Sequence, residues 1–155
     1  MDRIDRNILQ VLQKEGRISN LDLAEKTALS ASPCSRRVKR LEDDGFVSSY
    51  VARLNPDALG LKLMAMIQIS LDRHTPERFE DFEQKVSAFE EVMECYLITG
   101  QQADYLLKVI VPDMDYYQEF LLGKLTRIEG VTGVHSSFVM RKVIDSTALP
   151  MQHFE

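Results

Sequence analysis

The sequence predicts an α+β protein in which an N-terminal winged helix-turn-helix is joined to a C-terminal ferredoxin-like βαββαβ domain. Three observations predict this: an amphipathic basic segment at residues 29–41, two helical segments before it, and a strand–helix–strand pattern that occurs twice after residue 60. Hydrophobic periods of 3.6 and 2 residues distinguish helices from strands. We expect a first domain at 1–53, a linker at 54–60 and a second domain at 61–155.

The segment 29–41 has two different faces when it is wound as a helix. Cys34, Val38 and Leu41 form an apolar stripe at i, i+4 and i+7. Serine and basic side chains suit a DNA major groove, because arginine can bind guanine edges while serine and lysine reach phosphates and bases. An ordinary solvated helix face is the alternative. The candidate DNA-contacting residues are Ser30, Ser32, Ser35, Arg36, Arg37, Lys39 and Arg40.

Two shorter helices precede this segment. Asp2 can cap the first, which we expect to stop at Gly16, and Ser19 or Asn20 can cap the second, which ends near Thr27. A turn of three residues, 28–30, then leads to the third helix. Two helices joined by so short a turn are typical of a helix-turn-helix.

The third helix has its own start and stop signals. Ser30 or Ser32 can cap it, Pro33 fits its first turn, and Asp44-Gly45 closes it. Residues 46–52 then alternate as a strand does, which predicts a wing. With these neighbours, DNA binding becomes the favoured interpretation of the basic face.

Charge is distributed unevenly along the chain. The net charge is −5, but residues 1–50 hold 9 Lys and Arg against 8 Asp and Glu, whereas residues 51–155 hold 10 against 16. A near-neutral unit with one basic face is compatible with nucleic acid. No apolar run is long enough for a membrane span, and Cys34 and Cys95 form no CxxC pair. We expect a cytoplasmic protein without a metal site or a disulfide framework.

The rest of the chain repeats a strand, a helix and a strand. Phe79, Phe82, Val86 and Phe89 give the first of its two helices an apolar stripe. The order βαββαβ places four antiparallel strands against two helices on one face. The expected strands are 61–72, 92–99, 105–111 and 131–143, and the helices begin at Thr75-Pro76 and Pro112-Asp113.

The second face of this sheet has no helix to cover it. Met64, Met66, Cys95, Leu97 and Val139 are the candidates to lie there. An exposed apolar face normally finds a partner. We expect two copies of the chain to pair through their sheets.

The loop from Thr99 to Asp104 is a candidate small-molecule site. Gly100 permits a tight turn, exposed amides can hold a carboxylate, and Asp104 can hold an ammonium group. These groups together suit a free amino acid. A hairpin that needs Gly and Asp for its turn is the alternative, and residue chemistry alone favours it.

Motifs along the whole chain add to this interpretation. The chain resembles the leucine-responsive/asparagine-responsive (Lrp/AsnC) family of feast–famine transcriptional regulators. The motifs that carry the resemblance are Asp2-Arg3-Ile4-Asp5-Arg6-Asn7-Ile8-Leu9, Gly16-Arg17-Ile18-Ser19-Asn20, Pro33-Cys34, Arg37-Val38, Arg40-Leu41-Glu42, Gly45-Phe46, Leu54-Asn55-Pro56, Glu94-Cys95, Asp104-Tyr105-Leu106-Leu107-Lys108 and Val111-Pro112-Asp113-Met114.

The resemblance implies a DNA-binding regulator whose C-terminal domain binds an amino acid, with leucine or methionine expected, and which forms dimers that often assemble into octamers. Relatives usually have two residues between the glycine and the aspartate of the loop, whereas this chain has three, Gln101-Gln102-Ala103. The added residue leaves the identity of the effector open. The effector-binding residues that the resemblance implies, with the added loop residues, are Thr99, Gly100, Gln101, Gln102, Asp104, Tyr105, Ser136 and Ser137.

An enzyme is the main alternative of a different class. His74, His135 and His153 lack metal-ligand spacing, and no nucleophile–base pair or phosphate loop is visible, so we expect no catalytic residue, metal or cofactor. An effector-independent architectural DNA-binding protein and the amino-acid-binding module of a metabolic enzyme are further alternatives. Arg37 has two candidate roles, DNA contact or pairing with an acid on another helix.

Overall fold

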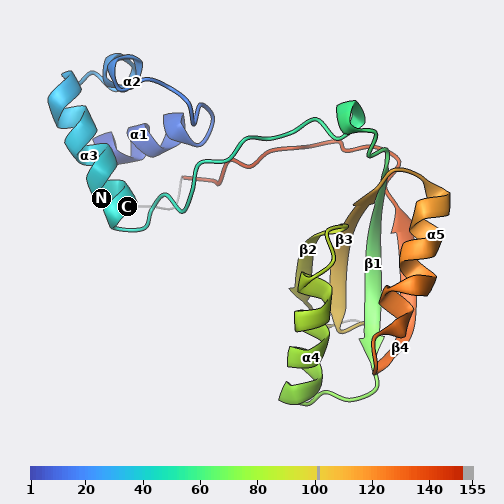
Figure 1. Ribbon diagram of the computed structural model, residues 1–155. Coiled ribbons are helices and arrows are strands. Elements are labelled where there is room, and N and C mark those ends of the chain that lie inside the picture. Colours follow the sequence, from blue (N-terminus) through green and yellow to red (C-terminus); the bar gives the residue numbers. More distant parts are fainter. Residues whose placement is uncertain (101, 152–155) are drawn as a thin grey trace. The chain divides into compact units, whose positions relative to one another are not determined.

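The computed structural model describes residues 1–100 and 102–151, and its chain divides into two compact units (Figure 1). The first unit contains Met1–Arg53 and the segment that begins at Val143, while the second contains Leu54–Lys142. Our expectation placed the end of the chain in the second domain. Within the first unit, Gln13 Oε1 accepts a hydrogen bond of 2.9 Å from the backbone N–H of Leu149, and Met151 packs against the core.

Three helices form the first unit: α1 (Arg3–Leu12), α2 (Asn20–Lys26) and α3 (Ala31–Asp43). The predicted caps of α1 and α2 are confirmed. Asp2 Oδ1 accepts a bond of 2.8 Å from the N–H of Asp5, and Ser19 Oγ accepts one of 3.1 Å from the N–H of Asp22. The expected stop of α1 at Gly16 is wrong, because the helix already ends at Leu12. The chain turns there, and the N–H groups of Lys14 and Glu15 both bond to the backbone oxygen of Val11.

The core of this unit comes from the predicted apolar stripes. Its buried members are Ile8, Leu9, Leu12, Leu23, Ala24, Cys34 and Leu41. The end of α3 is also as expected, since Gly45 takes a φ of 78° and Phe46 N–H bonds to the oxygen of Leu41. The wing strand expected at residues 46–52 is not present. In the described part of the first unit no strand lies beside this segment, so it has no partner for a β-ladder.

The second unit has the predicted βαββαβ order. It contains β1 (Leu63–Leu71), α4 (Pro76–Ser87), β2 (Val92–Leu97), β3 (Tyr105–Val111), α5 (Met114–Gly123) and β4 (Val131–Phe138), with short 3₁₀ turns at Asp57–Leu59 and Leu125–Arg127. All pairings are antiparallel and the sheet order is β2-β3-β1-β4. β4 ends earlier than expected because its partner β1 begins at Leu63, and the last bond, from Val139 N–H to Met64 O, already lies at that end.

Alternate residues of the two central strands build the core under the helices. Ala65, Ile67 and Ile69 of β1 are buried with Leu107 and Val109 of β3. Phe82 and Val86 of α4 and Tyr117 and Phe120 of α5 pack against the same side, so both helices cover one face of the sheet (Figure 1). No helix among the described residues covers the opposite face.

Sheet pairing corrects part of the composition expected for that open face. Met64 and Met66 lie on it, and Val139 lies opposite Met64. Cys95 and Leu97 do not, because they pair with the core residues Leu107 and Tyr105 and therefore lie on the helix-covered side. The pairing register of β2 shifts between Val92 and Glu94, so its residues do not alternate regularly between the two faces of the sheet.

Candidate nucleic-acid interface and effector loop

The third helix presents the predicted polar face. Cys34 and Leu41 are buried and Val38 is half-buried against the other helices, so the stripe opposite to them points outward. Ser30 occupies the N-cap position but makes no side-chain capping bond. The exposed candidates for DNA contact are Ser30, Ser32, Ser35, Arg36, Lys39 and Arg40.

The turn between α2 and α3 is held by backbone hydrogen bonds. Leu29 N–H bonds to Ala24 O at 2.8 Å and Ala28 N–H to Glu25 O at 3.2 Å, the two bonds of a Schellman motif. Ala28 has a φ of 55°, in the position where glycine is usual. These bonds fix the direction in which α3 leaves the turn.

Two arginines of α3 are paired with acids at the start of α1. Arg37 Nη1 lies 2.6 Å from Asp2 Oδ2 and 2.7 Å from Asp5 Oδ1, and Arg40 Nη2 lies 2.6 Å from Asp5 Oδ2. Backbone bonding by Asp5 and the guanidinium of Arg37 lower the pKa of Asp2 to about 2. The same carboxylates raise the pKa of Arg37. The alternative that Arg37 pairs with an acid on another helix is therefore confirmed.

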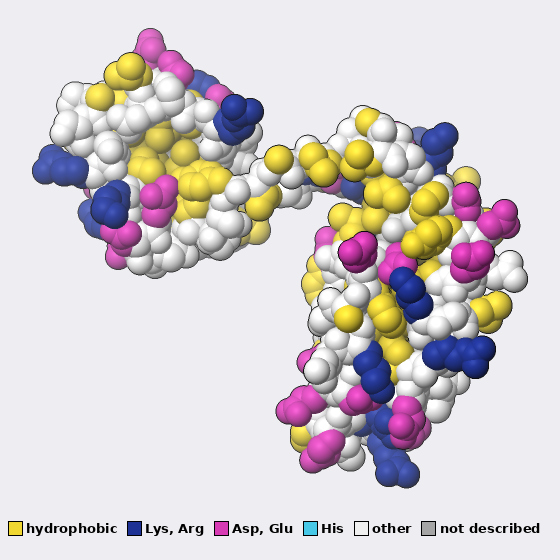
Figure 2. Space-filling model, in the orientation of Figure 1, with side chains coloured by type: hydrophobic (Ala, Val, Ile, Leu, Met, Phe, Trp, Pro, Cys, Tyr) yellow, Lys and Arg dark blue, Asp and Glu magenta, His cyan; other side chains and the backbone are white. Residues whose placement is uncertain are grey.

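The other two cations of α3 are more available. Lys39 Nζ lies 3.5 Å from Asp43 Oδ2, a surface pair one turn away on the same helix. Arg36 is exposed and makes no ion pair with any residue that the structure describes. Figure 2 shows acidic side chains beside basic ones on the visible face of this unit, so the basic residues form no continuous patch there.

The predicted effector loop is docked against the end of β1. Asp104 Oδ2 accepts a bond of 2.7 Å from the N–H of Leu71, and Asp104 Oδ1 lies 2.7 Å from His74 Nε2. Ser70 Oγ donates to Gln102 O at 3.0 Å. Gly100 takes a φ of 87°, as a tight turn requires, while Gln101 lies outside the described residues.

The remaining predicted effector residues lie on different sides of the sheet. Tyr105 is buried in the helix-side core, where its hydroxyl donates to Glu83 Oε1 at 2.7 Å. Ser136 shares a hydrogen bond with the hydroxyl of Tyr117 on the same side. Ser137 lies opposite Met66 on the open face. The isolated chain thus gathers Gly100, Gln102 and Asp104 in one loop with the exposed Thr99, and leaves the other three residues apart from it.

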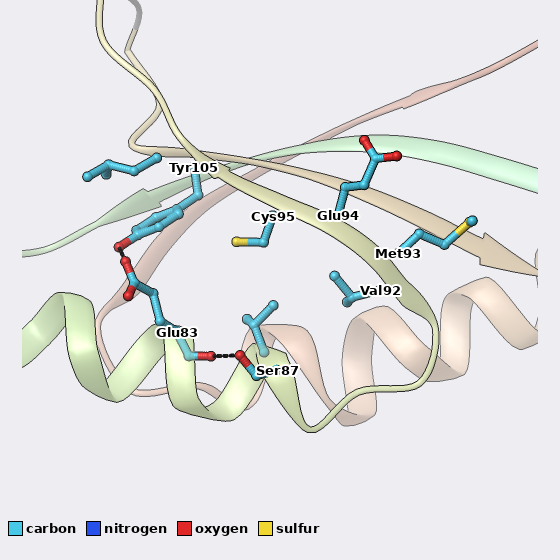
Figure 3. A pocket seen from close by; sticks show the side chains of 9 residues that line it. Glu83, Ser87, Val92, Met93, Glu94, Cys95 and Tyr105 are labelled. Carbon is cyan, nitrogen blue, oxygen red and sulfur yellow. Dashed lines mark hydrogen bonds between the residues drawn. The ribbon is translucent and has the colours of Figure 1, made fainter. Parts of the chain in front are cut away.

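A pocket of about 350 Å³ lies between α4 and β2 (Figure 3). Glu83 and Ser87 line it from the helix, and Cys95 and Tyr105 line it from the strands. Burial and the Glu83 carboxylate raise the pKa of the Cys95 thiol to about 11. Sequence reasoning did not predict this pocket, because it assigned Cys95 to the open face.

Two groups of polar contacts were also missed. Asp2 and Asp5 were recognised only as residues that start a helix. The expectation that Arg37 pairs with an acid on another helix did not name these two aspartates as its partners. His74 was considered only as a possible metal ligand. Among the described residues there is no cluster of potential metal ligands and no helix long and apolar enough to span a membrane.

Comparison with known families covers both units. Residues 1–48 match a winged helix-turn-helix DNA-binding family, and residues 64–149 match the Lrp/AsnC ligand-binding domain. The leucine-responsive regulatory proteins of Escherichia coli and Klebsiella pneumoniae are each 46% identical over 149 residues, which is 96% of this chain and 90% of theirs.

Solved structures show the same similarity. A transcriptional regulator from Neisseria meningitidis, crystallised in complex with L-methionine, has a TM-score of 0.95 at 42% identity and covers 99% of this chain and 98% of its own. A regulator from Agrobacterium tumefaciens has a TM-score of 0.92 at 38% identity and covers 97% of both chains.

Proposed function

The chain belongs to the Lrp/AsnC family. It is not an enzyme but a DNA-binding transcriptional regulator, and it responds to an amino acid. From this premise we propose that its effector is methionine or leucine, that the loop at Asp104 binds it, and that α3 contacts DNA. We further propose that two copies form a dimer, which presents two recognition helices to related half-sites.

The proposed DNA contacts follow from exposure and charge. Arg36 and Lys39 project from the outer face of α3 without a short ion pair among the described residues, and Ser32 and Ser35 lie beside them. Arg40 is about half exposed, at 53%, and its pairing with Asp5 uses one terminal nitrogen. A phosphate contact by Arg40 therefore competes with its pairing to Asp5. Arg37, which is 26% exposed, serves mainly to join α3 to α1.

The proposed effector site uses the carboxylate of Asp104 for the ammonium group and the amides around Gly100 for the carboxylate. Asp104 Oδ1 faces the exposed His74, so an ammonium group can reach it by replacing the imidazole. Gln102 and Thr99, which are both exposed, supply the rim. The Tyr105, Ser136 and Ser137 contacts that the family resemblance implies require the loop to rearrange or a second copy to approach.

The proposed dimer covers the open face of the sheet. Met64, Met66, Leu106 and Ile110 are half-buried there without a covering helix, and Tyr96 is 49% exposed. Such a face is stabilised by a second sheet about 10 Å away. Four such dimers would form the octamer, in which an amino acid at a contact between dimers favours one assembly over another.

The observation that carries the choice of effector is the similarity over nearly the whole chain to a regulator crystallised with L-methionine and to leucine-responsive regulators. The test is a thermal melt of the purified protein with each of the twenty amino acids. A ligand at a hundredfold excess over its Kd stabilises the folded state by about 2.7 kcal/mol. We expect L-methionine or L-leucine to raise Tm and the corresponding D-enantiomers to have no effect.

A second measurement separates a sensor from an architectural protein. Duplexes are selected from a random pool by the purified chain, and their binding and the sedimentation of the protein are then measured with and without the stabilising amino acid. A change in affinity or assembly supports the proposal. Unchanged binding, unchanged assembly and no shift in Tm would identify an effector-independent DNA-binding protein.

A further inference from the structure

The start of α1 holds the recognition helix through a compact group of four charged side chains: Asp2, Asp5, Arg37 and Arg40. Asp5 is the centre of this group. Its side chain is 2% exposed, and each of its oxygens accepts a hydrogen bond from a different arginine, at 2.7 Å from Arg37 and 2.6 Å from Arg40. Asp5 Oδ2 also accepts a bond of 3.1 Å from the N–H of Asp2.

The burial of Asp5 makes these partners necessary. A carboxylate removed from water is costly unless it is paired and hydrogen-bonded. Releasing either arginine to a DNA phosphate would leave one oxygen of Asp5 without its ion-pair partner. Asp2, which is 52% exposed, holds Arg37 from the other side at 2.6 Å. The guanidinium groups of Arg37 and Arg40 are therefore held toward α1.

This arrangement divides the four basic side chains of α3 into two pairs. The positive charges of Arg37 and Arg40 are balanced by Asp5 of α1 and by its N-cap residue, Asp2. Arg36 and Lys39 remain as the cations that α3 can offer without breaking a contact to another helix. Because non-specific binding depends on the number of phosphates that are neutralised, balancing two charges lowers it.

We infer that Asp5, assisted by Asp2, determines specificity by holding Arg37 and Arg40 out of general phosphate contact, so that the exposed face of α3 reads DNA with few free charges. Asp5 acts through the arginines and is a positioning residue. The inference rests on the proposed use of α3 for DNA contact.

The test compares Asp5→Asn and Asp2→Asn with the unaltered chain. Binding to a selected duplex and to a random-sequence duplex is measured by fluorescence anisotropy from 50 to 300 mM KCl. Each newly made phosphate contact steepens the slope of log K against log salt by about 0.9. We expect Asp5→Asn to bind random DNA about tenfold more tightly at the lowest salt, with a steeper slope and a smaller ratio of specific to non-specific affinity.

Asp2→Asn keeps the test decisive if Asp5→Asn does not fold. Asparagine is as good an N-cap as aspartate, so this variant keeps α1 while removing one charge beside Arg37. We expect a smaller change in the same direction. Glu15→Gln is the matched control, since it also removes one acid and releases a cation, Lys26, which pairs with Glu15 at 2.5 Å but lies on α2. Its slope on random DNA should change less than that of either aspartate variant.

The outcomes distinguish this inference from the proposed function. If the folded aspartate variants lose affinity for both duplexes with an unchanged slope, the acids have only a structural role and the inference is wrong. Slopes and ratios equal to those of the unaltered chain overturn it as well. If the unaltered chain selects no duplex from the random pool, it is the proposed use of α3 that fails.

Discussion

His74 Nε2 lies 2.7 Å from Asp104 Oδ1 at the end of β1, while Asp104 Oδ2 accepts a bond of 2.7 Å from the N–H of Leu71. The carboxylate that we propose for ammonium binding thus also closes the loop between β2 and β3 onto β1. The two oxygens have different environments, since Leu71 is buried and the side chain of His74 is 67% exposed. An effector can compete with His74 on one oxygen while the other keeps the loop in place.

Replacing Asp104 should show how much its hydrogen bond with the N–H of Leu71 contributes to stability. We expect Asp104→Ala to lower the free energy of unfolding by about 1–3 kcal/mol, because the buried N–H of Leu71 is left without an acceptor. Asp104→Asn keeps an acceptor oxygen and should cost about 1 kcal/mol or less. Urea denaturation followed by tyrosine fluorescence measures both, since every tyrosine except Tyr50 lies in the second unit. Equal losses in the two variants would contradict a role for the bond to Leu71.

The hydrogen bond that Asp2 accepts from the N–H of Asp5 and its ion pair with Arg37 predict a specific acid dependence. Its pKa is about 2 in the folded protein and near 3.8 in an unfolded chain, so folding favours the charged form. Its contribution to stability is present above about pH 4 and is lost as the pH falls towards 2. We expect the difference in Tm between the unaltered chain and Asp2→Asn to shrink over that window, as measured by circular dichroism. A difference that stays constant from pH 6 to 2 would contradict the lowered pKa of Asp2 in the folded protein.

Local signals were sufficient to predict most elements. Asp2, Ser19 and Pro76 were recognised as helix starts because capping residues and proline act within one turn of the chain. Strands β1 and β3 were located by alternation, and their buried residues follow it in the structure. The βαββαβ order then limited the sheet to very few arrangements.

Features that depend on distant pairing could not be predicted. The parity of β2 is set by its pairing with β3 and by the shift after Val92, so Cys95 was assigned to the wrong face. The prediction of a wing strand at residues 46–52 was wrong for a related reason. Alternation shows that a segment can pair as a strand, but not whether a partner strand lies beside it. The contacts of Asp5 with Arg37 and Arg40 join positions more than thirty residues apart, and only the fold brings them together.

The turn before α3 contains a site where a substitution should stabilise the chain. Ala28 takes a φ of 55°, a left-handed conformation that costs a residue with a Cβ roughly 1 kcal/mol. We expect Ala28→Gly to raise the free energy of unfolding by about 0.5 kcal/mol after the entropy of the unfolded glycine is counted. Urea denaturation followed by circular dichroism at 222 nm measures it. Ala28→Val, whose branched side chain tolerates this φ poorly, is the control and should destabilise; if both variants destabilise equally, the turn depends on something other than φ.

The position of Cys95 in the pocket between α4 and β2 predicts how fast its thiol reacts. The thiolate is the reactive form, and a pKa of about 11 leaves about a hundredfold less of it at pH 8 than the ordinary value of 9 does. Cys95 is accessible to a reagent, so its rate reports the thiolate fraction, and we expect iodoacetamide to modify it more slowly at pH 8 than a small free thiol with that ordinary pKa, with a rate that still rises with pH between pH 8 and 10. Mass spectrometry of the peptide that contains Cys95 measures the rate, and the buried Cys34 should remain unmodified until the chain unfolds.

The carboxylate of Glu83 gives this prediction its control. Burial raises the pKa of the Cys95 thiol first, and the negative charge of Glu83 raises it further. Glu83→Gln removes the charge while keeping an acceptor for the hydroxyl of Tyr105, so the pocket should persist and Cys95 should react faster at pH 8. Because burial is the larger cause, the variant should still react more slowly than the free thiol. A rate for the unaltered chain that matches the free thiol and levels off near pH 9 would contradict the raised pKa of Cys95.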